Sequence, residues 1–147
     1  MSTTESILVV PIDFHEASLK ALEMAKELAP VYDARIVLLH VCTIPVYAYP
    51  GLAPMLMQGL NEDVLAAAKK ATTELAERHG GLEVVVRDGD AATEILDFVK
   101  ERNPKLVVMG THGRRGLTHI LLGSVAEKIV RQSAAPVMTV RVAGPQA

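Results

Sequence analysis

The positions of apolar and polar residues along the chain predict short strands separated by amphipathic helices. Five short runs are apolar and rich in Val, Ile and Leu, which is typical of strands buried on both faces of a parallel sheet. We expect these strands at residues 7–12, 35–41, 82–87, 105–109 and 137–142.

Between these runs, apolar residues recur every three or four positions, which is the spacing of one helix face. In the first helix the apolar stripe consists of Ala21, Leu22, Ala25, Leu28 and Ala29. The second helix is expected from about residue 60 to residue 79, because residues 42–59 contain several prolines and glycines and are typical of a long loop. Two more helices follow, and Asp90 is a candidate N-cap for the third.

Strands that alternate with helices are typical of an α/β fold, in which helices cover both faces of a parallel sheet. The five strands and four helices predict a single open five-stranded parallel sheet. At 147 residues, the chain fits one domain, residues 1–147, which buries roughly 70% of its unfolded surface. In such sheets, ligands bind beyond the carboxyl ends of the strands, where the strand order reverses.

Composition and charge argue against several classes of partner. Fifteen basic and seventeen acidic residues give a formal net charge of −2, so we expect neither a basic stripe for nucleic acid nor a polybasic membrane anchor. No apolar run approaches the roughly 20 residues of a membrane-spanning helix, and the polar first residues do not resemble a signal peptide. Cys42 is the only cysteine, so an internal disulfide is impossible. We therefore expect a cytoplasmic protein.

A glycine-rich segment after the fourth strand carries the most specific chemical signal. It reads Gly110-Thr111-His112-Gly113, and Gly123-Ser124 opens the last helix. Glycines let the chain turn sharply and bring backbone N–H groups close to a ligand, and a helix N-terminus favours an anion. The segment therefore predicts a phosphate site. It is neither a P-loop, which needs G-x4-G-K-[ST], nor the dinucleotide motif G-x-G-x-x-G.

The remaining pattern, G-x2-G-x9-G-S after a buried strand, resembles the ATP-binding signature of the universal stress protein family. The resemblance extends from residues 7–13 (ILVVPID) through 39–41 (LHV) to 123–128 (GSVAEK) and 135–141 (APVMTVR). It implies a Rossmann-like fold of the adenine nucleotide alpha hydrolase-like type, with strand order 3-2-1-4-5. It also implies ATP as the ligand, with Mg²⁺ or Mn²⁺ as metals that could accompany the phosphates. A homodimer through the strand from Val137 to Val142 is implied too, since an exposed edge invites association.

Candidate binding residues lie at the ends of two strands and around the glycines. Asp13 could accept hydrogen bonds from a ribose hydroxyl or help hold a hydrated metal. Ser124 could donate to a phosphate, and Arg114 could neutralise its charge. The resemblance implies that the backbone of Val41 reads the adenine edge and that Pro11 flanks the ring. The full predicted set is Pro11, Asp13, Val41, Met109, Gly110, His112, Gly113, Arg114, Gly123, Ser124 and Val125.

Several of these residues also have a purely structural interpretation. Asp13 could cap the first helix, Ser124 could be an ordinary N-cap, and Arg114 could simply be solvated. No histidine belongs to an H-E-x-x-H pattern, and one cysteine cannot build a thiolate zinc site. We therefore predict no catalytic residue and no metal site formed by protein ligands alone.

The preferred functional hypothesis is an ATP-binding module in stress resistance or signalling, with a protein partner that the sequence does not identify. A slow ATP hydrolase or phosphotransfer enzyme is the main alternative, although the chain lacks a P-loop lysine and a water-positioning residue. A protein-interaction module that binds no nucleotide is a third possibility. Many members of the family carry Gly or Ser after the Asp of the first strand, whereas this chain carries Phe14 and His15, which could narrow the mouth of the site.

Overall fold

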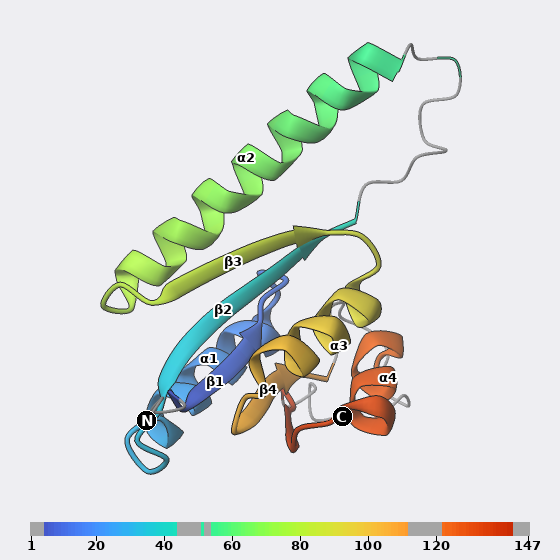
Figure 1. Ribbon diagram of the computed structural model, residues 1–147. Coiled ribbons are helices and arrows are strands. Elements are labelled where there is room, and N and C mark those ends of the chain that lie inside the picture. The colour runs from blue at the N-terminus through green and yellow to red at the C-terminus, as the bar shows by residue number, and fades with distance from the viewer. Residues whose placement is uncertain (1–4, 44–50, 52–53, 112–121, 143–147) are drawn as a thin grey trace, which may run out of the picture.

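Five parallel strands form one central sheet in the order β3-β2-β1-β4-β5 (Figure 1). This order confirms the one that the family resemblance implied. The computed structural model describes residues 5–43, 51, 54–111 and 122–142. Each strand begins and ends within two residues of its predicted bounds. The elements are β1 (Ile7–Pro11), α1 (Glu16–Leu28), β2 (Arg35–Cys42), α2 (Pro54–Arg78), β3 (Glu83–Asp88), α3 (Ala91–Arg102), β4 (Leu106–Gly110), α4 (Ser124–Gln132) and β5 (Val137–Val140).

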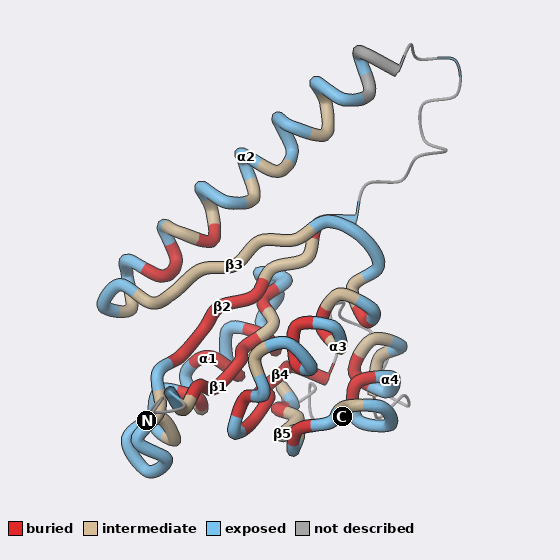
Figure 2. Tube along the Cα trace, in the orientation of Figure 1, coloured by how far each residue is buried: buried red, intermediate tan, exposed pale blue. Residues whose placement is uncertain are grey.

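The alternation of side chains along the strands divides the core into two layers. Ile7 and Val9 of β1 pack with residues of α3 and α4, whereas Leu8 and Val10 pack with residues of α1 and α2. All four side chains are buried, and Figure 2 shows the same buried stretch continuing into β2 and β4. Because helices cover both faces of the sheet, β1 and β4 in its centre are apolar at every position.

The predicted start of the second helix is wrong, because α2 begins at Pro54 rather than near residue 60. A proline fits the first turn of a helix, where its missing N–H would have no intrahelical partner. Gly59 lies inside the helix, where glycine costs roughly 0.5–1 kcal/mol relative to alanine and is tolerated. Residues 44–50 and 52–53 of the predicted loop lie outside the described residues.

Among the described side chains of α2, those buried against the sheet lie in its C-terminal half. The helix lies along β3 and extends past the end of the strand (Figure 1). Its buried residues in the described set are Thr72, Leu75 and Ala76, whereas Leu56 is 62% exposed. In the described portion of the chain, no helix combines the length and apolar character that crossing a membrane requires.

The predicted N-cap of α3 is confirmed. The Asp90 carboxylate accepts hydrogen bonds from the Thr93 hydroxyl at 2.8 Å and from the Thr93 N–H at 3.0 Å. These two bonds lower the pKa of Asp90 below its ordinary value. The cap fixes the start of α3 next to the end of β3.

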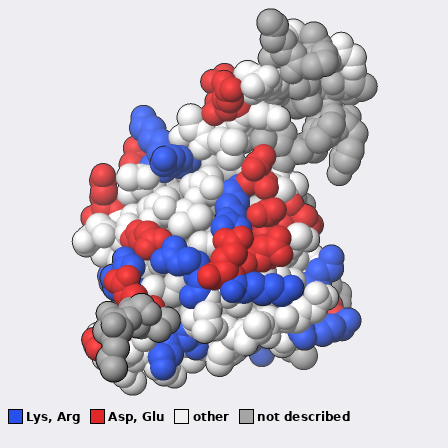
Figure 3. Space-filling view, viewed as in Figure 1, with Lys and Arg blue, Asp and Glu red and all other residues white. Residues whose placement is uncertain are grey.

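Acidic and basic side chains interleave over β2, β3 and α3 (Figure 3). Arg102 of α3 donates to Glu83 of β3, with Nη1 2.8 Å from Oε2, and this hydrogen bond lowers the pKa of Glu83. Arg87 of β3 pairs with Glu101 of α3. The guanidinium groups of Arg87 and Arg102 lie 5.1 and 5.5 Å from the ring centre of the buried Phe98. These pairs fasten the edge strand β3 to α3.

Candidate functional site

A cavity of about 350 Å³ lies at the carboxyl ends of β1 and β4. The helix that follows β1 packs on one face of the sheet and the helix that follows β4 packs on the other. The strand order therefore reverses between these two neighbouring strands, and open parallel sheets bind ligands at such points. Small-molecule sites have volumes of roughly 300–1,000 Å³, so the cavity is large enough for a ligand.

The structure brings most of the predicted binding residues together around this cavity. His112, Gly113 and Arg114 lie outside the described residues. The other eight all line the cavity: Pro11, Asp13, Val41, Met109, Gly110, Gly123, Ser124 and Val125. They come from four separate segments of the chain, which the fold places at one edge of the sheet.

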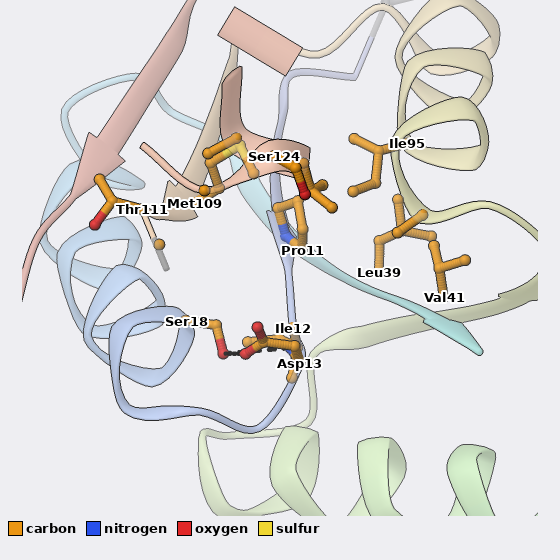
Figure 4. A pocket seen from close by; sticks show the side chains of 15 residues that line it. Pro11, Ile12, Asp13, Ser18, Leu39, Val41, Ile95, Met109, Thr111 and Ser124 are labelled. Atoms are coloured by element: carbon orange, nitrogen blue, oxygen red, sulfur yellow. Dashed lines mark hydrogen bonds between the residues drawn. The ribbon is translucent and has the colours of Figure 1, made fainter. Parts of the chain in front are cut away.

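The inner wall of the cavity is apolar. Leu39 and Val41 come from β2 and Ile95 comes from α3, and these side chains lie close together in Figure 4. Pro11 of β1 and Met109 of β4 lie beside them. A flat apolar group could be enclosed between these side chains.

Val41 lies in β2, two residues past the last residue of β2 that pairs with β1. The pairing of β1 with β2 ends at Pro11 and Leu39, and the Ile12 N–H donates to the Leu39 carbonyl at 2.8 Å. In a parallel ladder, the backbone groups of alternate residues point to the same neighbouring strand, so those of Val41 point in the same direction as those of Leu39. Among the described residues, none bonds to them. One donor and one acceptor are therefore available beside the apolar wall.

The N-terminus of α4 also faces the cavity. Gly123 is the N-cap, with φ −69° and ψ 167°, and no side chain of the described residues caps this end. The Gly123 N–H donates to the Thr111 carbonyl at 2.7 Å, and Thr111 in turn donates to the Val140 carbonyl at 3.0 Å. Ser124 is the first helical residue rather than the N-cap, which corrects the structural interpretation of this serine. Its exposed hydroxyl and the first N–H groups of α4 are donors for an anion.

Gly110 has a packing role that the glycine motif did not reveal. It lies in β4 and does not have a positive φ. A Cβ atom at this position would lie 2.7 Å from both the backbone carbon and the Cβ of Ala17, and 2.8 Å from the Ser18 nitrogen. Glycine is therefore required here because α1 passes close to β4. The expectation that the glycines let the chain turn sharply is therefore wrong for Gly110, which is the last residue of a strand.

Asp13 is held by hydrogen bonds at the start of α1. Its Oδ1 accepts from the Ser18 hydroxyl at 2.7 Å and from the His15 N–H at 2.9 Å, and Figure 4 shows the contact with Ser18. His15 is the N-cap of α1, and its side chain does not cap the helix. Within the described residues, no donor reaches Asp13 Oδ2. Asp13 therefore stabilises the helix start and keeps one carboxylate oxygen for another partner.

A comparison with protein families identifies this architecture. The model of the universal stress protein family matches residues 6–141. The chain belongs to the universal stress protein family. Universal stress protein MJ0531 of Methanocaldococcus jannaschii is 33% identical over 138 residues, covering 91% of this chain and 81% of the relative. YxiE of Bacillus subtilis is 31% identical over 144 residues, covering 91% of this chain and 97% of the relative.

Solved structures of other universal stress proteins share the fold. UspA from Lactobacillus plantarum has a TM-score of 0.77 at 23% identity, with 92% of this chain and 97% of the other covered. MJ0577 has a TM-score of 0.80 at 24% identity, with 96% and 99% covered. A universal stress protein solved in complex with cAMP has a TM-score of 0.63 at 20% identity, with 96% and 100% covered. These likenesses show the Rossmann-like α/β fold.

Several residues that line the cavity of this universal stress protein were not predicted from the sequence. Ser18 could have been found, since it is a hydroxyl residue in the first turn of a helix that follows Asp13. Thr111 lies inside the glycine motif, yet its buried side chain gave no separate signal. The others read as ordinary core or helix residues. The full unpredicted set is Ile12, Ser18, Leu39, Ala91, Ile95, Thr111 and Ala126.

Asp13 is the one charged side chain among the described residues that line the cavity. The described residues contain no cluster of three or more His, Cys, Asp or Glu side chains that could hold a metal ion. Cys42 is buried, and this burial raises the pKa of its thiol, so it does not behave as an activated nucleophile. Phe14 and His15 are not among the lining residues. The ring of Phe14 instead lies 5.1 Å from that of His40.

Proposed function

We propose that this universal stress protein binds an adenine nucleotide, with ATP preferred, and that nucleotide occupancy regulates its stability or its affinity for a protein partner. One observation carries the proposal. An apolar wall, backbone groups of Val41 that no described residue bonds, and a helix N-terminus that no described side chain caps meet at a cavity of about 350 Å³, where the strand order reverses. A nucleotide has an apolar base at one end and an anion at the other, so it matches both features.

The adenine ring belongs against the apolar wall. Val41, Ile95 and Met109 provide contact surface, and the Val41 N–H and carbonyl provide one donor and one acceptor. The edge of adenine carries a ring nitrogen that accepts and an amino group that donates. Guanine presents a carbonyl in place of that amino group, so the same backbone pair favours adenine.

The phosphates belong at the start of α4. The Ser124 hydroxyl and the N–H groups of Ser124 and Val125 are donors at the positive end of the helix dipole. Hydrogen bonds to a charged group contribute about 1.5–3 kcal/mol each. His112, Gly113 and Arg114 belong to the segment between β4 and α4, and we propose that they complete the phosphate site.

Asp13 belongs beside the ribose or beside a metal ion that accompanies the phosphates. Its free Oδ2 can accept from a ribose hydroxyl, or it can bind a hydrated Mg²⁺ or Mn²⁺. One carboxylate alone does not build a metal site from protein ligands, so any metal would depend on the phosphates. The universal stress protein solved with cAMP supports an adenine nucleotide as the class of ligand for this fold.

Binding of this kind can act as a signal without chemical turnover. A ligand at 100 times its dissociation constant stabilises the folded state by about 2.7 kcal/mol. That free energy is large enough to shift an equilibrium between two conformations, or between the free protein and its complex with a partner. Nucleotide occupancy would therefore have a regulatory role in stress resistance.

We also propose a homodimer through the free edge of β5. This strand lies at the end of the sheet. The carbonyl of Pro136, just before β5, accepts from Val107 of β4, and the Val140 carbonyl accepts from Thr111, just after β4. By alternation, the N–H of Thr139 points to the free edge. Thr139→Pro would remove that donor and yield a monomer in analytical ultracentrifugation, whereas Thr139→Val would remain a dimer. A monomeric wild-type protein would refute this part of the proposal.

Isothermal titration calorimetry and thermal melting test nucleotide binding directly. We expect ATP to bind and to raise the melting temperature by about 5–10 °C at 100 times its dissociation constant. AMP, cAMP and GTP, each with and without Mg²⁺, define which base and which phosphates matter. If none of these nucleotides binds, the proposed function is wrong.

A matched pair of glycine variants locates the site. Gly123→Val places a side chain at the head of α4, and the extended backbone of Gly123 accepts valine without strain. This variant should fold and lose ATP binding. Gly59→Ala in α2 brings the added Cβ within 4 Å of no described atom outside its own stretch of helix, and this variant should bind ATP as the wild type does. Unchanged binding by Gly123→Val would exclude the head of α4 as the phosphate site.

A further inference from the structure

The turn that leaves β1 is tied to β2 through both backbone groups of one residue. The Ile12 N–H donates to the Leu39 carbonyl at 2.8 Å, and the Ile12 carbonyl lies 2.6 Å from His40 Nδ1. A carbonyl oxygen only accepts hydrogen bonds, so His40 Nδ1 must carry the proton. The side chain of His40 thus fixes the orientation of the peptide that precedes Asp13.

The next residues of this turn adopt an unusual conformation. Phe14 has φ +64°, which is rare for a bulky side chain. Its ring packs on that of His40, with 5.1 Å between the ring centres and 59° between the planes. A residue in the left-handed region persists only where its surroundings hold it. The contact with His40 is such a restraint.

The consequence of this turn is the placement of the Asp13 carboxylate. The left-handed residue folds the chain back, so that Asp13 Oδ1 accepts from the His15 N–H and from the Ser18 hydroxyl. The second oxygen, Oδ2, remains available at the cavity. We propose that His40 is a positioning residue for ligand binding, which acts mainly through its hydrogen bond to the Ile12 carbonyl, with the ring contact to Phe14 as a smaller restraint, so that Asp13 presents its carboxylate to the nucleotide. This inference rests on the proposed function.

Two substitutions separate the hydrogen bond of His40 from its ring contact. His40→Asn keeps an N–H donor near the position of Nδ1 and removes the ring. His40→Phe keeps a ring against Phe14 and removes the donor. We expect His40→Phe to weaken ATP binding about tenfold and His40→Asn to weaken it less than about threefold, as measured by calorimetry. Equal affinities for the wild type and both variants would overturn the inference, and so would a loss of affinity in His40→Asn that equals the loss in His40→Phe.

A double-mutant cycle with Asp13→Ala distinguishes positioning from a general loss of stability. If His40 acts through Asp13, His40→Phe should change ATP affinity less than about twofold once Asp13 is already absent. A similar tenfold loss in both backgrounds would show that His40 does not act through Asp13.

A spectroscopic measurement on the wild-type protein needs no variant. Long-range ¹⁵N–¹H correlation spectra should show His40 protonated at Nδ1 at neutral pH. A neutral His40 protonated only at Nε2 would overturn the inference, even if His40→Phe failed to fold. Absence of ATP binding by the wild type would refute the proposed function and the inference together, whereas normal wild-type binding with unaffected variants would refute the inference alone.

Discussion

Replacing Gly110 with alanine tests the close packing of α1 on β4. The added Cβ would lie 2.7 Å from two Ala17 atoms and 2.8 Å from the Ser18 nitrogen. Two of these three atoms belong to the backbone of a helix that is buried against the sheet, so they cannot move aside as a flexible side chain would. The substitution therefore requires α1 to shift away from β4.

The expected cost follows from overpacking. Extra carbon atoms in a well-packed core destabilise by about 1–3 kcal/mol. For a chain of about 150 residues, each kcal/mol lowers the melting temperature by about 2–4 °C, so Gly110→Ala should melt about 2–12 °C below the wild type. Because Ser18 bonds to Asp13, the same shift should also weaken ATP binding.

Gly59→Ala is the matched control for this variant. It makes the same chemical change inside a helix, where no described atom outside that stretch of helix lies within 4 Å of the new Cβ. Alanine is better than glycine in a helix interior by about 0.5–1 kcal/mol. Urea denaturation should therefore show the two variants moving in opposite directions from the wild type. A Gly110→Ala protein as stable as the wild type would refute the packing argument.

Two further predictions concern charged side chains at α3. Arg102 lowers the pKa of Glu83, so this carboxylate stabilises the fold at neutral pH, and its contribution is lost as the pH falls below the usual glutamate value of about 4.3. Glu83→Gln should therefore flatten the fall in unfolding free energy between about pH 5 and pH 3, and an unchanged slope would contradict the assignment. Asp90→Ala should lower the melting temperature because Thr93 loses its acceptor, whereas Asp90→Asn should stay close to the wild type; equal melting of all three proteins would show that the cap is unimportant.

The sequence predicted the strands well because each has a short core of consecutive apolar residues. The central strands β1 and β4 are buried on both faces, and an apolar run of this length that is rich in Val favours a strand over a helix. The N-cap of α3 could be predicted equally well, because the hydrogen-bond partner of Asp90 lies only three residues later in the chain. Local signals of this kind do not depend on the rest of the fold.

The errors arose where tertiary contacts decide the outcome. The start of α2 was misplaced because Pro54 and Gly59 are loop signals in isolation, although a helix accommodates the first in its opening turn and the second within it. The glycine at position 110 was attributed to ligand binding, whereas the atoms that exclude a side chain there belong to α1. The role of His40 depends on a contact with Ile12, 28 positions away in sequence. A sequence pattern does not indicate which residues so far apart in the chain lie in contact.

A crystal structure of the protein grown with ATP would show directly whether the nucleotide occupies the cavity. We expect adenine against Val41 and Ile95, with its edge on the Val41 backbone, and phosphate oxygens within hydrogen-bonding distance of the Ser124 and Val125 N–H groups. Nucleotide bound elsewhere on the molecule, or a cavity that stays free of nucleotide at saturating ATP, would contradict this expectation.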